Sequence, residues 1–283
     1  MAICSKELCT GSTAMNVLKQ AYLRVEQSFL QPLIYALMLL TTLPVHKLGL
    51  LPQDVDYNAK AVSSSLHFYP LVGLILGLIL WALCLLWLHL FPVPVAAGLA
   101  LLCWILLTGA LHLDGLADSA DAWLGGLGSK ERTLRIMKDP NAGPAGVCAI
   151  VLCILLKYIA LNALFAAESN ALPALLIWPL ILSRSTIPLI IISTPYARKN
   201  GIASPISTRY NMQAIILSSL LCTALLVLTL QAIGAALLVG CLMVTIGLRI
   251  AMLKRLSGYT GDTLGATIEL CELSCLLVFC ANL

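Results

Sequence analysis

LHLDGLADSAD, at residues 111–121, follows a long apolar segment and carries three carboxylates. If one helix runs through the stretch, Asp114, Asp118 and Asp121 stand at positions i, i+4 and i+7, within roughly 40° of one another around the helix axis. Like charges at this spacing repel one another, so a cation is expected between them. Mg²⁺ is commonly held by one or two carboxylates together with substrate phosphates. The stretch therefore predicts a metal–diphosphate site at a membrane surface, with a solvated acidic helix end as the alternative.

The composition is that of a membrane protein. Of the 283 residues, 60% are hydrophobic and 11% are charged, against about a quarter charged in soluble domains. We expect an all-α, polytopic integral membrane bundle, because the chain has room for about seven transmembrane helices of ~20 residues. The expected spans are 68–91, 95–113, 145–167, 172–194, 212–230, 233–250 and 263–282.

The N-terminal part of the chain departs from this pattern. Segment 29–45 is short for a crossing and is interrupted by Pro32 and Pro44, so we expect a re-entrant or interfacial helix there. Residues 1–27 form a polar N-terminal extension without the features of a signal peptide. Residues 28–283 are expected to be a single transmembrane catalytic domain.

The charges indicate topology rather than a nucleic-acid partner, because the net charge of +4 is small and dispersed. The connections near 92–94, 168–171 and 231–232 contain no lysine or arginine. By the positive-inside rule the remaining connections are cytoplasmic, and the aspartates lie in or beside them. Their basic residues are Lys130, Arg132, Arg135, Lys138, Arg198, Lys199, Arg209, Lys254 and Arg255.

Two further stretches could bind phosphate. Arg132, Arg135 and Lys138 recur around apolar residues, as in a short interfacial helix. They could attract anionic lipid or contact substrate phosphates. The sequence GYTGDTLG at 258–265 offers glycines, hydroxyl groups and a helix N-terminus to a phosphate. Asp262 within it could equally be only a helix cap.

Four charged residues fall inside the expected spans and away from their ends: Lys157, Arg184, Glu269 and Glu272. Counting ~1.5 Å per residue from the expected cytoplasmic ends places all four at comparable depth. Charges inside a membrane are rare and usually pair. We therefore expect Lys157 and Arg184 to face Glu269 and Glu272, either as a structural network or as ligands for substrate.

Taken together, these stretches resemble the cobalamin-5′-phosphate synthase family, also called adenosylcobinamide-GDP ribazoletransferase. The resemblance covers the chain from about residue 29 to the C-terminus, and the acidic and glycine motifs in tandem are highly specific. The motifs that carry it are Thr42-Leu43-Pro44-Val45, Phe68-Tyr69-Pro70-Leu71-Val72-Gly73, Leu107 to Asp121, Arg135-Ile136-Met137-Lys138-Asp139, Tyr196-Ala197-Arg198, and Gly258 to Ala266 running on to Ile268-Glu269-Leu270.

The resemblance implies a Mg²⁺-dependent enzyme of the bacterial-type cytoplasmic (inner) membrane. It would join adenosylcobinamide-GDP to α-ribazole or its 5′-phosphate and release GMP, in the final stage of cobalamin biosynthesis. Asp114, Asp118, Asp121 and Asp262 are the candidate metal ligands and catalytic residues, and one helix carboxylate would accept the hydroxyl proton. The candidate substrate- and phosphate-binding residues are Arg132, Arg135, Lys138, Asp139, Lys157, Arg184, Arg198, Tyr259, Thr260 and Thr263. The expected partners also include the lipid bilayer, and a homo-oligomer or a complex with other cobalamin-assembly enzymes is left open.

Two positions depart from the family pattern. Pro140-Asn141-Ala142 replaces a serine, an arginine and an aliphatic residue, and Ala122 replaces a glycine. A phosphate-binding arginine is therefore absent from its usual position.

Two other functions fit parts of the sequence. A CDP-alcohol phosphotransferase also uses clustered aspartates on membrane helices, but its later Gly-x3-Asp-x3-Asp pattern is absent here. An ion-coupled transporter would fit the charges inside the spans, but the sequence shows none of the internal symmetry typical of transporters.

Overall fold

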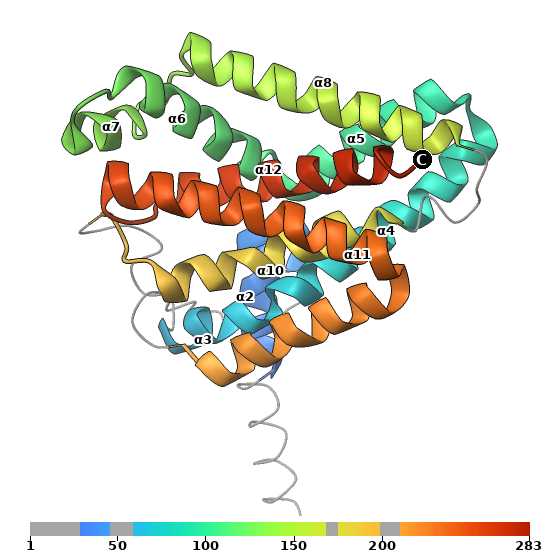
Figure 1. The fold of residues 1–283 in the computed structure, drawn as a ribbon, viewed down its shortest axis with the longest axis horizontal. Coiled ribbons are helices and arrows are strands. Elements are labelled where there is room, and N and C mark those ends of the chain that lie inside the picture. The colour runs from blue at the N-terminus through green and yellow to red at the C-terminus, as the bar shows by residue number, and fades with distance from the viewer. Residues whose placement is uncertain (1–28, 46–58, 168–174, 199–209) are drawn as a thin grey trace, which may run out of the picture.

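Long apolar helices set the direction of the bundle (Figure 1). The computed structural model describes residues 29–45, 59–167, 175–198 and 210–283. In chain order the elements are α2 (Gln31–Leu40), α3 (Ala59–Ser64), the 3-10 helix η3 (Ser65–Phe68), α4 (Tyr69–Leu90), α5 (Val93–Thr108), α6 (Leu111–Gly125), α7 (Lys130–Ile136), α8 (Pro144–Ala166), α10 (Ile177–Ser193), α11 (Met212–Leu256) and α12 (Gly261–Cys280). The extension 1–27 lies outside the described residues, so the expected domain division stays a prediction.

The polytopic helical class is confirmed. Four described helical stretches are long and apolar enough to cross a membrane: Val62–Leu90, Pro144–Ala166, Met212–Leu256 and Gly261–Cys280. The bent pair of α5 and α6 would raise the number to five if it forms one span. Because α10 is a shorter apolar helix by the same measure, the expected count of about seven spans stays a prediction.

The turn between α5 and α6 corrects the expected span 95–113. The apolar helix ends at Thr108, and α6 leaves at an angle of 85° to it. Gly109 and Ala110 make the turn with φ values of 63° and 56°, in the left-handed region that glycine adopts at little cost. Thr42 holds the end of α5, because its hydroxyl donates to the Leu106 carbonyl at 2.7 Å. The acidic stretch is therefore a separate helix.

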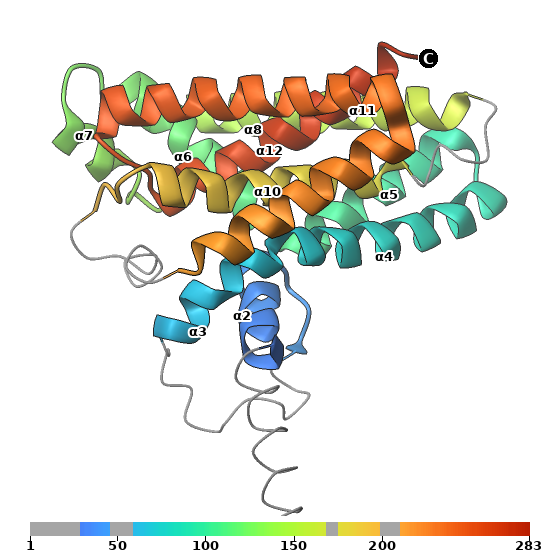
Figure 2. The ribbon, with the colours of Figure 1, turned by 60° about the horizontal axis from the view of Figure 1, so that its bottom comes forward.

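The long helix α11 contains a break that folds it back on itself (Figure 2). Gln231 has non-helical φ and ψ values of 48° and −119°, so two helical arms meet there. This break falls between the two spans expected at 212–230 and 233–250. It lies at the end of the bundle that also holds the connection between α4 and α5.

The short helix α2 lies across the direction of the long helices (Figure 2). It has 10 residues, or about 15 Å of helix, which is half the ~30 Å hydrocarbon thickness. It is therefore too short to cross a membrane by itself, in keeping with the re-entrant or interfacial helix expected there.

The opposite end of the bundle brings separate parts of the chain together. The views in Figures 1 and 2 both place α7, the end of α10, the end of α11 and the start of α12 at this end. These segments and the connections next to them contain most of the described residues that the sequence marked as candidates for binding phosphate or metal.

Candidate functional site

One helix carries all three clustered aspartates, as the spacing argument required. Asp114, Asp118 and Asp121 lie on α6, which has 15 residues and at about 22 Å is too short to span a membrane by itself. The helix packs closely on the start of α12. A Cβ atom built on Gly115 would stand 2.7 Å from the carbonyl oxygen of Asp262. The absence of a side chain at Gly115 therefore brings Asp262 beside the α6 carboxylates.

The carboxylates influence one another electrostatically. Burial and then the negative charges of Asp114, Asp262 and Asp121 raise the pKa of Asp118 to about 6. Burial disfavours the ionised carboxyl group, and like charges nearby add to this effect. The site thus holds more negative charge than the protein around it neutralises.

Asp121 plays a local structural part that its spacing did not reveal. Its two carboxylate oxygens accept hydrogen bonds from the backbone N–H groups of Gly143, at 2.7 Å, and Gly146, at 2.9 Å. These groups belong to the first turn of α8, where N–H groups have no partner within the helix. Asp121 therefore caps α8 and ties it to α6.

Asp262 forms an ion pair with Arg198. Its Oδ2 atom lies 2.6 Å from Nη2 of Arg198, and the two side chains are 21% and 18% exposed. The backbone next to Arg198 is held to the segment before α12. The Ala197 N–H donates to the Tyr259 carbonyl at 2.9 Å, and the Tyr259 N–H donates to the Pro195 carbonyl at 2.9 Å. This short parallel bridge places Arg198 beside the acidic site.

The expected metal ligands do not form a ready-made cage. Within the described ranges, no three His, Cys, Asp or Glu side chains are grouped closely enough to hold a metal ion. Asp121 is engaged with backbone N–H groups and Asp262 with Arg198. The carboxylates of Asp114 and Asp118 accept no hydrogen bond from the described groups. Two available carboxylates suit Mg²⁺, which usually completes its shell with water and substrate phosphates.

The residues of the glycine-rich loop shape the start of α12. Thr260 and Thr263 form a capping box, in which each hydroxyl accepts a hydrogen bond from the other residue's backbone N–H. Both side chains are buried, as is Tyr259. In this arrangement Thr260 and Thr263 cap the helix, and all three predicted phosphate-binding side chains are buried.

The basic stretch lies at the surface next to this loop. Ser129 caps α7 by accepting a hydrogen bond from the Arg132 N–H, while Arg132, Arg135 and Lys138 are exposed. Met137 is buried, and its sulfur lies 3.8 Å from the Thr260 hydroxyl. The three basic residues therefore belong to a segment that contacts the cap of α12 through Met137, and their side chains are exposed.

The departure at Pro140-Asn141-Ala142 has a local consequence. Asn141 donates to the Asp139 carboxylate from its backbone N–H, at 3.0 Å, and from its side chain, at 2.8 Å. These hydrogen bonds hold the pKa of Asp139 below its ordinary value. The exposed Asp139 is thus fixed in a turn between α7 and α8.

Two residues that support the site were not predicted. Arg255 donates to the Thr133 hydroxyl at 3.1 Å and to the Trp123 carbonyl at 2.9 Å, joining α11 to α7 and α6. From the sequence, Arg255 was expected only as one of the basic residues of the cytoplasmic connections. The structure places it in the last turn of α11, where a cation is favourable. Thr42, which holds the end of α5, stood in a quoted motif but had no assigned role.

The four charged residues inside the bundle contact one another. Nζ of Lys157 lies 2.7 Å from Glu269 Oε2 and 2.6 Å from Glu272 Oε2. Arg184 pairs with the other oxygen of Glu272. All four side chains are buried, and together they link α8, α10 and α12. Lys157 and Arg184 are thus enclosed by protein in this structure, and their expected contact with substrate stays a prediction.

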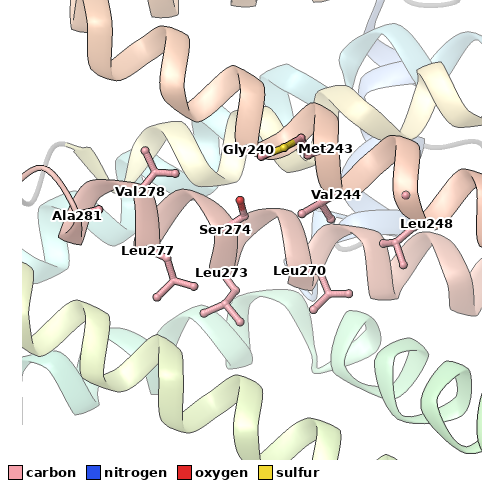
Figure 3. Close-up of a pocket in the computed structure, with 11 residues that line it drawn as sticks. Gly240, Met243, Val244, Leu248, Leu270, Leu273, Ser274, Leu277, Val278 and Ala281 are labelled. Atoms are coloured by element: carbon pink, nitrogen blue, oxygen red, sulfur yellow. The ribbon is translucent and has the colours of Figure 1, made fainter.

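An apolar groove lies between α11 and α12 (Figure 3). It has a volume of about 640 Å³ and is lined by Met243, Leu248, Leu273 and similar residues, with Ser274 as its polar side chain. Asp114, Asp118 and Asp262 do not line it. Both helices that line it are candidate membrane spans.

Known proteins resemble the chain over nearly its whole length. Residues 32–280 match the family described as cobalamin-5-phosphate synthase. The adenosylcobinamide-GDP ribazoletransferase of Pseudomonas fluorescens (strain Pf0-1) is 44% identical over 250 residues, covering 87% of this chain and 97% of that protein. The proteins of the same name from Pseudomonas putida (strain GB-1) and Stutzerimonas stutzeri (strain A1501) are 45% and 43% identical, each covering 87% of this chain and 97% and 96% of their own lengths.

None of the solved structures matches the chain. The matches reported above support neither a CDP-alcohol phosphotransferase nor an ion-coupled transporter. The helical class, the order of the motifs and the similarity over most of the chain all agree with one family. The chain belongs to the cobalamin-5-phosphate synthase family.

Proposed function

We propose that this protein transfers the adenosylcobinamide phosphate group from adenosylcobinamide-GDP to α-ribazole or α-ribazole 5′-phosphate. A ribose hydroxyl oxygen attacks the phosphorus linked to cobinamide, the bond from that phosphorus to the bridging oxygen breaks, and GMP leaves with the electron pair. The products are adenosylcobalamin, or its 5′-phosphate, and GMP.

The observation that carries the proposal is the contact between α6 and α12. It gathers Asp114, Asp118 and Asp262, and the segment that carries the exposed Arg132, Arg135 and Lys138 contacts Thr260 beside Asp262 through Met137. Carboxylates held beside cations suit a metal-bound diphosphate, because phosphoryl transfer depends mainly on positioning and charge neutralisation. The names of the relatives, which specify a GDP-linked substrate, point to the same chemistry.

The aspartates divide the work. Asp114, Asp118 and Asp262 would hold Mg²⁺, which when bound neutralises charge on the diphosphate. Asp121 keeps α6 and α8 in register, since both of its oxygens are already hydrogen-bonded. The hydroxyl proton passes to Asp114 or Asp118, whose oxygens are available. The exposed cations of α7 contact the phosphates as charge-assisted hydrogen-bond donors.

We place the protein in a bacterial cytoplasmic membrane with this site facing the cytoplasm. The segments around the site contain Lys130, Arg135, Lys138, Arg198 and Arg255. The opposite end of the bundle, at the connection between α4 and α5 and at the break in α11, has no lysine or arginine. The positive-inside rule gives this orientation, which also exposes the site to nucleotide substrates.

The direct test is GMP release by the purified protein in detergent. Adenosylcobinamide-GDP is supplied with α-ribazole or its 5′-phosphate, with and without Mg²⁺, for wild type, Asp118→Asn and the control Glu131→Gln. Glu131 is an exposed acid on α7, so its change removes one charge without touching the cluster. We expect metal-dependent release that falls at least ~100-fold in Asp118→Asn only. Well-folded wild type that releases no GMP would overturn the proposal.

A further inference from the structure

The ion pair of Arg198 and Asp262 occupies a position that a metal ion would need. Oδ2 of Asp262 accepts from Arg198 at 2.6 Å and also from the Thr260 hydroxyl at 3.4 Å. Asp262 is also the carboxylate of α12 that stands beside Gly115 on α6. A divalent cation between the α6 carboxylates and Asp262 would therefore lie next to the Arg198 guanidinium and be repelled by it.

The surroundings of Arg198 leave its side chain free to find another partner. Its backbone neighbours are fixed by the bridge between Pro195, Ala197 and Tyr259. Its Nε atom is buried and has no hydrogen-bond partner among the residues that the structure describes. A guanidinium binds phosphate in two-pronged fashion through neighbouring N–H groups, and only Nη2 is engaged with Asp262.

We propose that Arg198 is an exchanging residue of the active site, an inference that rests on the proposed function. Without substrate, Arg198 neutralises Asp262 and weakens metal binding. When a nucleoside diphosphate arrives, Arg198 turns from Asp262 to the phosphates and Asp262 turns to the metal. Metal and diphosphate thus bind cooperatively, and the coupling is carried by one side chain.

Metal binding without turnover tests the exchange. Mn²⁺, which also prefers oxygen ligands, is titrated into the purified full chain and the free ion is followed by electron paramagnetic resonance, with and without GDP. Without GDP, we expect Arg198→Gln to bind Mn²⁺ about tenfold more tightly than wild type, because a positive charge beside the metal is gone. GDP should tighten Mn²⁺ binding strongly in wild type and less in Arg198→Gln, since linkage is reciprocal.

Two variants serve as controls. Arg198→Lys keeps the charge, so its Mn²⁺ affinity without GDP should stay near that of wild type. Arg249→Gln removes an arginine that bonds Ser193 and Thr194 on the same segment and does not pair with the aspartates. It should leave both Mn²⁺ affinity and coupling unchanged.

The failures are distinguishable. Suppose that Arg198→Gln binds Mn²⁺ no more tightly than wild type does, while the wild type shows metal-dependent GMP release. This result would overturn the exchange and leave the proposed function standing. Absence of Mn²⁺ binding in every variant, with and without GDP, would overturn the exchange together with the metal site. If Arg198 had only a structural role, Arg198→Gln would weaken Mn²⁺ binding, whereas the exchange predicts tighter binding.

Discussion

Gly115 of α6 lies so close to Asp262 of α12 that a methyl group on Gly115 would stand 2.7 Å from the Asp262 carbonyl oxygen. Backbone cannot yield as a flexible side chain can, so Gly115→Ala should push the two helices apart. A displacement of about 1 Å at a reacting centre can cost ~100-fold in rate. We therefore expect kcat/KM for GMP release to fall by about that factor.

Gly98→Ala is the matched control for this change. Gly98 lies in α5, and a methyl group there would stand 3.9 Å from the Tyr158 ring, an ordinary contact. Alanine also favours a helix over glycine by about 1 kcal/mol, so this variant should keep its activity and its thermal stability. Full activity in Gly115→Ala would show that the close approach of α6 to α12 is not needed.

Asp121→Asn should lower the stability of the protein more than it lowers the affinity for metal. An amide side chain can accept through one oxygen only, so one N–H group at the start of α8 loses its partner. We expect the free energy of unfolding to fall by about 1–2 kcal/mol, measured by thermal unfolding in detergent. Loss of Mn²⁺ binding with an unchanged unfolding temperature would instead make Asp121 a metal ligand.

The metal-free protein should be more stable at mildly acidic pH because of Asp118. Its pKa is raised from 3.8 to about 6, so across that interval the folded state binds more protons than the unfolded state. The contribution of Asp118 to stability is therefore largest below the lower value and is lost as the pH rises through about 6. Unfolding temperatures at pH 5 and pH 7 should differ less in Asp118→Asn than in wild type. An identical difference in the two proteins would contradict the raised pKa.

Lys157→Met should destabilise the protein more than Arg184→Met. Lys157 contacts both Glu269 and Glu272, so its loss leaves Glu272 with Arg184 alone and takes from the buried Glu269 its cation partner, at a cost of about 3–5 kcal/mol. Removing Arg184 leaves Glu272 paired with Lys157, and we expect a loss of about 1–3 kcal/mol.

Thermal unfolding in detergent compares these two variants with the exposed Lys254→Met as control. An unfolding temperature for Lys157→Met equal to that of the control would show that the buried pairs do not stabilise the bundle.

Several structural features could be predicted from local patterns in the sequence. The spacing of Asp114, Asp118 and Asp121 predicted that they share a helix, since that depends only on helical periodicity. The break at Gln231 separates two apolar runs that were expected as separate spans. Residues at similar depth, such as Lys157 and Glu269, could be matched by counting along helices.

Features that depend on contacts distant in sequence could not be predicted. The apolar helix ends at Thr108 partly because Thr42 binds its last turn, and the positive φ of Ala110 has no local signal. Asp121 becomes a cap only because the loop after α6 returns the start of α8 to it. Arg198 and Asp262 are 64 positions apart, and nothing in either motif indicates the other.

The buried charge network has a consequence for biogenesis. Lys157 and Arg184 are made before α12, which supplies both of their carboxylate partners. Until the ribosome has delivered α12, the nascent chain carries two cations in apolar helices without counter-ions, which resists their stable residence in lipid. Assembly of the bundle must therefore wait for α12.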